Sequence, residues 1–499
     1  MDCFVKGQGQ KACWDKEEEI RMERFLSVNF GASQPGSRLS FYQIVEVISQ
    51  QIQSDSALQG CRLPPIRVLA HQLGVSKNTI SAAYEELKAK GLVESRGRIG
   101  LFVSLGWDSF SRQFKGQSSG QVPLPVLKQK PSLRLSLGSQ EKFLLLSSVF
   151  IDPSLAPKER LANCFRSALK SPGLSRGTDP QGFLPLRKKI AERLQKRGIA
   201  AQPQQIMTTV GSQQVLDLLC RSMQSKVIAT ESPAYDLGKA LMEMNEMVSV
   251  GLPVDPFKGV NLIQWEKMIR ESKPGLIYLT SNFQNPTGYS YSSREMTQVV
   301  EWSQTYGFGI LEDDWGSDML SYSEFKPSLR ALGGDNVLYM NSFTKKLLPS
   351  LRLGYVVGNE ESISALVRSK SLTVSSAPPI IEAALFEFLD RGYYDAHLKK
   401  VQQELDARYQ NCLELLRNSM PQDVRWTSPG GGPVLWLELP KSIDLEQLVL
   451  RLKEEGVIVR CSHDAFFGTP HLHGFKIGYA FLSIQEMQIA IGKLSQVLK

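Results

Sequence analysis

A lysine and several polar residues in the C-terminal part of the sequence have the types needed to handle an aromatic aldehyde. Lys345 could form an imine with such an aldehyde, because a lysine amine attacks carbonyl carbon. Asp313 could keep a pyridine nitrogen protonated, so that the ring withdraws electrons. The run Gly211-Ser212-Gln213-Gln214 opens an amphipathic helix, whose N-terminus could hold a phosphate together with Ser342 and Arg352. This set suits one cofactor, a phosphorylated pyridine aldehyde.

These residues follow apolar runs that are typical of buried parallel strands. The runs are Val227-Ile228-Ala229, Leu276-Ile277-Tyr278-Leu279, Ile310-Leu311, Val337-Leu338-Tyr339-Met340 and Tyr355-Val356-Val357. Ligands of open α/β sheets bind outside the carboxyl ends of the strands. We therefore expect residues 135–499 to form an α/β domain with its site at that edge of the sheet.

The constellation resembles fold-type I pyridoxal 5′-phosphate (PLP) enzymes of the aspartate aminotransferase class, which have a large and a small subdomain. The resemblance implies that Lys345 is the Schiff-base lysine, that Asp313 partners the pyridine nitrogen and that Tyr235 stacks on the ring. Asn285, in Asn-Pro-Thr-Gly, would hydrogen-bond the ring O3′. The phosphate ligands would be Ser212, Gln213, Ser342 and Arg352. Lys346 is an alternative to Lys345, but the Ser-x-x-Lys spacing favours Lys345. Each motif alone also fits a plain turn or helix cap.

Two positions depart from the family pattern. Most members have a tyrosine that donates to O3′ two residues after the aspartate, where this chain has Trp315. The family's closing arginine, which clamps a substrate carboxylate, is matched by Lys476. Lysine attracts a carboxylate but lacks the fork geometry of arginine. The effector is therefore expected to be something other than a simple α-amino acid, or a poor substrate.

Residues 39–105 predict a winged helix-turn-helix of the α+β class. Three helical patterns follow one another, and the third begins at Ser76, a good N-cap residue. Two short strands around a basic turn then form the wing. Exposed polar and basic side chains on these elements suit DNA backbone and base contacts. The candidate DNA-binding residues are Arg67, Ser76, Lys77, Asn78, Thr79, Arg96 and Arg98.

This unit resembles the GntR family, and the two halves together resemble the MocR/GabR subfamily of bacterial transcription regulators. The resemblance implies a PLP-dependent regulator that forms a homodimer, with winged helices that can be swapped between subunits, and binds double-stranded promoter DNA. Its effector would be an amino compound or PLP itself, and its targets would be genes of amino-acid, amine or vitamin B6 metabolism. One alternative is an active aminotransferase with a secondary DNA-binding domain. Another is a DNA-binding protein whose second domain only dimerises.

The remaining composition is that of an ordinary soluble protein. The 499 residues carry a net charge of +8, which permits an anionic partner without demanding one. Residues 1–38 are expected to form a polar extension and residues 106–134 a flexible basic linker. The seven Cys residues are scattered, and the Cys461–His473 region fits no zinc pattern, so no metal is expected. No signal peptide or membrane-spanning run is evident, which favours a cytoplasmic protein.

Overall fold

The computed structural model describes residues 40–97, 99–105, 143–170, 179–319 and 327–499. The chain divides into two compact units, Met1–Lys128 and Gln129–Lys499. The predicted extension 1–38, the predicted linker 106–134 and the wing residue Arg98 lie outside the described residues.

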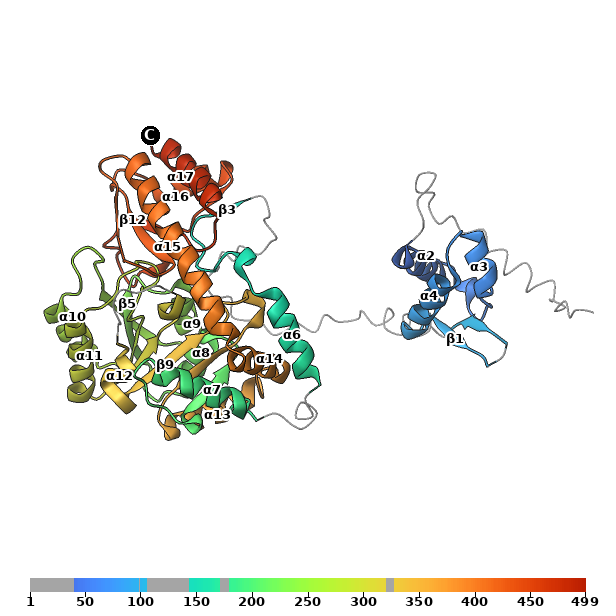
Figure 1. The fold of residues 1–499 in the computed structure, drawn as a ribbon, viewed down its shortest axis with the longest axis horizontal. Coiled ribbons are helices and arrows are strands. Elements are labelled where there is room, and N and C mark those ends of the chain that lie inside the picture. The colour runs from blue at the N-terminus through green and yellow to red at the C-terminus, as the bar shows by residue number, and fades with distance from the viewer. Residues whose placement is uncertain (1–39, 98, 106–142, 171–178, 320–326) are drawn as a thin grey trace, which may run out of the picture. The chain divides into compact units, whose positions relative to one another are not determined.

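The N-terminal unit is a three-helix bundle with a two-stranded wing (Figure 1). Its elements are α2 (Phe41–Ser54), the 3-10 turn η1 (Ser56–Leu58), α3 (Ile66–Gln72), α4 (Lys77–Ala89), β1 (Val93–Ser95) and β2 (Leu101–Val103). A capping box at Ser40 begins α2, and the Ser76 side chain caps α4. Ile44 of α2, Leu69 of α3 and Ile80 of α4 share one buried core, so the three helices stabilise one another. The prediction of a helix-turn-helix followed by a wing is confirmed.

The second unit is built on a seven-stranded sheet with the order β4-β10-β9-β8-β7-β5-β6. The strands are β4 (Ile206–Thr209), β5 (Val227–Ser232), β6 (Val248–Pro253), β7 (Leu276–Leu279), β8 (Gly309–Asp313), β9 (Val337–Ser342) and β10 (Gly354–Val357). Successive residues of β7 enter different cores, Tyr278 on one face and Ile277 on the other. Both faces are therefore buried, which explains the continuous apolar runs of these strands.

Helices cover both faces of this sheet. One core joins the sheet to α8 (Ser212–Ser222), α9 (Asp236–Met244) and α13 (Glu360–Thr373). The opposite core joins it to α10 (Leu262–Ser272), α11 (Ser293–Tyr306) and α12 (Leu329–Gly333), seen together in Figure 1. A third core packs α6 (Lys158–Leu169), α7 (Leu184–Gln195) and α14 (Pro379–Asp390) beside β4 and β10. Short 3-10 turns are η2 (Pro153–Leu155), η4 (Pro203–Gln205), η5 (Ser317–Met319), η6 (Gly334–Asn336), η7 (Pro349–Leu351) and η8 (His463–Ala465).

A small subdomain follows α14. It contains α15 (Tyr393–Ser419), β11 (Arg425–Trp426), β12 (Val434–Glu438), α16 (Leu445–Glu454), β13 (Val457–Ile458), β14 (Gly474–Gly478) and α17 (Ile484–Leu498). Strands β11, β12 and β14 form an antiparallel sheet, and β13 pairs in parallel with β3 (Leu144–Leu145). Helix α15 belongs to two cores, because Leu398 packs with the large subdomain and Leu416 with the small one. The predicted large and small subdomains are thus confirmed.

The direction of β10 differs from our prediction. The run Tyr355-Val356-Val357 was expected to be a parallel strand, but β10 is antiparallel to both neighbours, β9 and β4. Residues 343–353 join β9 to β10 with one 3-10 turn and no crossover helix. A parallel pair needs a crossover of a dozen or more residues, so the short connection enforces the antiparallel direction.

Within the part of the chain that the structure describes, no helix combines the length and the apolar character needed to cross a membrane.

Candidate cofactor site and DNA-reading face

Lys345 lies just beyond β9, with its amine close to two aromatic rings. Its Nζ is 4.1 Å from the ring centre of Trp315 and 5.7 Å from that of Tyr235. Burial lowers the pKa of Lys345 to about 8, against the opposing attraction of Asp313. A lysine with such a pKa is partly neutral near physiological pH and can act as a nucleophile.

The amine of Lys346, the alternative lysine, is occupied by contacts within the protein. Lys346 is buried, its Nζ is ion-paired with Asp318, and it also donates to Asn341 Oδ1 at 2.5 Å. Its backbone oxygen lies 2.7 Å from Nε2 of His397 on α15. The lysine that faces the aromatic pair is therefore Lys345, whereas Lys346 fixes the segment that carries it.

Asp313 ends β8 with one satisfied and one unsatisfied oxygen. Tyr278 Oη donates to Asp313 Oδ2 at 3.0 Å, which orients the carboxylate. Asp313 Oδ1 is buried and has no hydrogen-bond partner among the described residues. Burial raises the pKa of Asp313, whereas the nearby charge of Lys345 lowers it. A buried acceptor without a donor costs free energy, so this oxygen suits the N–H of a protonated ring nitrogen.

Two further groups suit the hydroxyl edge of such a ring. The indole Nε1 of Trp315 is buried and has no hydrogen-bond partner within the described ranges. Asn285 Oδ1 accepts a 2.9 Å hydrogen bond from Lys476 Nζ. The Asn285 turn is held by Gln284, whose Oε1 accepts from the Thr287 backbone N–H at 3.0 Å. Trp315 thus leaves a free donor, whereas Asn285 and Lys476 already bind each other.

Glu231 joins the strand ends that carry Tyr235 and Asn285. Its buried carboxyl group accepts hydrogen bonds from the Thr280 backbone N–H at 3.0 Å and from Tyr291 Oη at 2.9 Å. Burial raises the pKa of Glu231 to about 8, more than these hydrogen bonds lower it. The group holds the loop between β7 and Asn285 in place.

Three of the four predicted phosphate ligands, Ser212, Gln213 and Arg352, lie at the start of α8. Gly211 precedes the helix with φ of 106°, and no side chain caps the helix. Arg352 Nη2 donates to the Val210 oxygen at 3.1 Å and would lie 3.1 Å from a Cβ at position 211. Ser212 and Gln213 form the first turn of α8. An uncapped helix N-terminus beside an arginine is a suitable place for an anion.

Ser342 is buried at the end of β9, where its Oγ accepts from the Thr344 backbone N–H at 3.2 Å. The hydroxyl proton remains able to donate.

The sequence did not indicate one pair of charged residues whose aspartate acts on the charge of Lys345. Arg460 Nη1 lies 3.2 Å from Asp236 Oδ2. Asp236 begins α9 directly after Tyr235, whereas Arg460 follows β13 in the small subdomain. Asp236 stands at a strand end that the sequence had already singled out, but no pattern in the sequence marks Arg460.

The DNA-reading candidates take different places in the N-terminal unit. Lys77 and Asn78 are exposed at the start of α4, and Arg67 is exposed on α3. Ser76 and Thr79 hold the helix start, because Ser76 Oγ accepts from the Thr79 backbone N–H at 3.1 Å and lies 2.8 Å from its hydroxyl.

Arg96 is partly engaged within the wing. Its Nη2 lies 2.7 Å from Glu94 Oε1, and its guanidinium stacks 4.7 Å from the Phe102 ring centre. The ion pair compensates part of the positive charge of the wing.

The histidines near Cys461 hydrogen-bond to backbone. His471 Nε2 lies 3.0 Å from the Val254 oxygen, and His473 Nε2 lies 2.8 Å from that of Ile443. No cluster of three His, Cys, Asp or Glu side chains able to hold a metal ion occurs in the described part of the chain.

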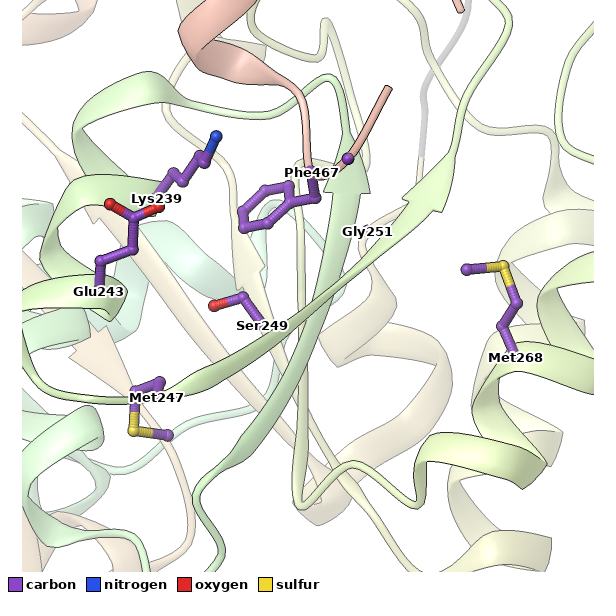
Figure 2. Close-up of a pocket in the computed structure, with 8 residues that line it drawn as sticks. Lys239, Glu243, Met247, Ser249, Gly251, Met268 and Phe467 are labelled. Atoms are coloured by element: carbon purple, nitrogen blue, oxygen red, sulfur yellow. The ribbon is translucent and has the colours of Figure 1, made fainter. Parts of the chain in front are cut away.

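An open groove of about 540 Å³ lies beside the edge strand β6. Figure 2 shows Lys239 and Glu243 of α9 on one side, Met268 of α10 on the other, and Phe467 between α9 and β6. Lys239 Nζ donates to the backbone oxygen of Phe466 at 2.6 Å. None of the predicted cofactor residues lines this groove. The groove therefore lies where α9 meets the small subdomain and is separate from the Lys345 site.

Two family models match the chain in succession. The model of bacterial regulatory proteins of the gntR family matches residues 42–103, and that of aminotransferase class I and II matches residues 145–494. The chain belongs to the MocR-type subfamily of GntR transcription regulators. The regulator joins a GntR DNA-binding domain to a fold-type I aminotransferase-like domain, as the sequence predicted.

The relatives of the regulator share this arrangement. It is 25% identical to the HTH-type transcriptional regulator YisV of Bacillus subtilis, over 90% of this chain and 94% of the relative. It is 24% identical to the HTH-type transcriptional regulator NorG of Staphylococcus aureus, over 88% and 99%. Among solved structures, the α-aminoadipate aminotransferase LysN of Thermus thermophilus, complexed with N-(5′-phosphopyridoxyl)-L-leucine, matches with a TM-score of 0.67 and 26% identity. That match covers 72% of this chain and 92% of LysN.

Proposed function

We propose that this regulator binds PLP at Lys345 and that an amino compound binding there controls its action on DNA. The proposal is carried by one arrangement: the Lys345 amine lies close to the rings of Tyr235 and Trp315, within the influence of the Asp313 charge, and Asp313 Oδ1 is buried with no partner among the described residues. The site therefore has a nucleophile, two aromatic side chains beside it and an acceptor without a donor.

The residues fit the cofactor at each of its polar groups. When bound, PLP supplies an aldehyde that combines reversibly with amines and a ring that withdraws electrons. Asp313 Oδ1 would accept the ring N–H and Trp315 Nε1 would donate to the ring hydroxyl, since neither atom has a partner among the described residues. Asn285, whose Oδ1 accepts from Lys476, would face the same hydroxyl. The phosphate would be held by Ser212, Gln213, Ser342 and Arg352. The phosphopyridoxyl compound complexed with LysN supports this assignment.

The chain's own groups prepare the site. Tyr278 fixes the Asp313 carboxylate by a 3.0 Å hydrogen bond, so the oxygen facing the site does not have to reorient. Lys346 holds the backbone beside Lys345 through Asp318, Asn341 and His397. Burial keeps part of the Lys345 population neutral and ready to accept a proton.

The effector would be an amino compound, or PLP itself. Its binding would alter the contacts of the small subdomain and so change the spacing of two winged helices in a homodimer, with or without exchange of these domains between subunits. Arg67, Lys77, Asn78, Arg96 and Arg98 would contact double-stranded promoter DNA, with Ser76 and Thr79 holding the helix start. The regulated genes would serve amino-acid, amine or vitamin B6 metabolism, in the cytoplasm.

The test is the visible absorption spectrum of the purified protein, followed by borohydride reduction and peptide mapping. We expect a yellow protein whose reduced label maps to Lys345. A protein that stays colourless after addition of PLP, with no label at Lys345, would contradict the cofactor assignment and leave the C-terminal domain as a dimerisation module.

A second candidate function is aminotransferase activity with DNA binding as a secondary property. The lowered pKa of Lys345 favours it, whereas Trp315 and Lys476 stand where the family places its tyrosine and arginine. Steady conversion of an amino donor with a 2-oxo acid would support the enzyme. Salt-sensitive binding to the DNA upstream of a neighbouring gene, altered by an amine, would support the regulator.

A further inference from the structure

The Asp236–Arg460 ion pair joins the two subdomains beside Lys345. Asp236 belongs to the large subdomain and Arg460 to the small one, and their 3.2 Å contact leaves the two side chains 27% and 44% exposed. Ion pairs this exposed contribute little free energy, so a competing anion can displace the Asp236 carboxylate from Arg460 at low cost.

Arg460 and Lys476 are neighbours through the hydroxyl of Ser147. Ser147 Oγ donates to the Lys476 backbone oxygen at 2.9 Å and accepts from the Arg460 backbone N–H at 3.2 Å. The side chains of both residues reach the large subdomain, Lys476 at Asn285 and Arg460 at Asp236. The small subdomain therefore presents two adjacent cations to the side of the site that carries Tyr235.

The charges of this group act on one another. Burial lowers the pKa of Lys476 to about 8, with smaller contributions from the positive charges of Arg460 and Lys345, and Asp236 opposes them. Asp236 likewise opposes the lowering of the Lys345 pKa. Asp236 is thus an anion placed among three cations.

We infer that Asp236 occupies the place of an effector carboxylate, and that an amino compound bearing a carboxylate binds Lys476 and Arg460 together and displaces Asp236 from Arg460. The inference rests on the proposed function, because it needs the amine of the effector at Lys345. Arg460 supplies the planar guanidinium that Lys476 lacks. It can therefore compensate for the lysine that stands at position 476 in place of the family's carboxylate-binding arginine.

Release of Asp236 changes one contact between the subdomains and leaves others. The Ala234 backbone N–H donates to the Ala465 oxygen at 2.8 Å, and the Phe467 N–H donates to Ser232 Oγ at 3.1 Å. Lys239 holds Phe466 beside the groove of Figure 2. These uncompeted contacts keep the subdomains attached, so exchange of the carboxylate can shift the small subdomain without separating it.

The test uses the full-length protein loaded with PLP and three compounds, L-norvaline, L-norvalinamide and n-butylamine. The amide and the amine keep the shape of norvaline but lack its carboxylate. Binding is measured by calorimetry and by the change in the visible absorption of the cofactor. We expect norvaline to bind at least about tenfold more tightly than either neutral compound, a difference of about 1.4 kcal/mol.

Two variants separate a carboxylate clamp from simple packing. Arg460→Gln is expected to weaken norvaline about tenfold and to leave norvalinamide within about twofold, since only the charge-assisted contact is lost. Asp236→Asn is expected to tighten norvaline several-fold, because the competing carboxylate is gone. Arg391→Gln is the matched control: Arg391 pairs with Glu387 on α14 at 2.6 Å, with similar exposures of 41% and 29%.

The outcomes distinguish this inference from the proposed function. The inference would be overturned if Arg460→Gln weakened the binding of all three compounds equally. It would also be overturned if the Asp236→Asn variant bound norvaline more weakly than the parent protein. A loaded protein that binds norvaline no better than norvalinamide would also overturn it and leave the PLP site intact. A protein that takes up no PLP would overturn both.

Discussion

The amine of Lys345 is expected to titrate far below an ordinary lysine. Its pKa of about 8 results from burial, which disfavours the ammonium, partly offset by Asp313. At about pH 7.5 roughly a quarter of the molecules would carry a neutral amine, whereas a free lysine side chain with a pKa of about 10.4 would be neutral in about one molecule in a thousand. The Lys345 amine should therefore react some two hundred times faster, about 24% against 0.13%, if intrinsic reactivity is equal.

Competitive labelling with dinitrofluorobenzene measures this directly. The protein is freed of carbonyl compounds with hydroxylamine and labelled in trace amounts across a pH series, with N-acetyl-lysine amide as the internal standard. Mass spectrometry of the Lys345 peptide gives the midpoint. Asp313→Asn should move that midpoint lower still, because the carboxylate that favours the ammonium is lost, while Asp217→Asn on α8 serves as the control.

A Lys345 midpoint equal to that of the standard would refute the reasoning. A midpoint raised by Asp313→Asn would do so as well, since it would mean that Asp313 does not act on Lys345 as a negative charge.

Three more predictions follow from the described contacts. Trp315→Phe should weaken PLP binding about tenfold in an absorbance titration, because it removes the unpartnered indole N–H, and Trp315→Tyr should retain more affinity; equal losses would exclude a donor role. Asn78→Ala should cost about 1–3 kcal/mol of binding to the preferred DNA sequence and little to unrelated DNA at the same salt concentration; equal losses on both would exclude base readout. The pKa of Glu231 is raised to about 8, whereas the same group in the unfolded chain has a pKa of 4.5. Between these two pH values the folded state holds a proton that the unfolded state has released. Glu231 therefore makes the free energy of unfolding fall as the pH rises from 4.5 to about 8. Glu231→Gln should remove that fall, seen as a gain in urea-unfolding stability relative to the parent from about pH 5 to 8; an unchanged pH profile would contradict the assignment.

The sequence was most informative where burial leaves a continuous pattern. The run Leu276-Ile277-Tyr278-Leu279 is apolar throughout because its alternate residues enter two different cores, so both the strand and its sheet could be predicted. The direction of β10 could not, because apolar pattern carries no sign of strand direction and only the length of its connection to β9 decides it.

The candidate site divides in the same way. Lys345, Asp313 and Asn285 stand in short motifs at strand ends, so the amino-acid sequence alone could indicate them. Arg460 lies 224 residues from Asp236 in the chain and carries no motif, so only the folded arrangement pairs them. The sequence indicated Arg96 as a candidate DNA contact, whereas its ion pair with Glu94 is evident only once the wing has formed.

Helix α15 connects the Lys345 site to the small subdomain as one continuous helix. Its 27 residues make a rod about 40 Å long, anchored near one end where His397 meets the backbone of Lys346 and packed at the other end into the small-subdomain core. A tilt of about 10° about His397 would move the far end of the helix, about 33 Å away, through about 6 Å. A small rotation of α15 where it contacts the Lys346 backbone would thus move the small-subdomain core by several ångströms, without any element having to unfold.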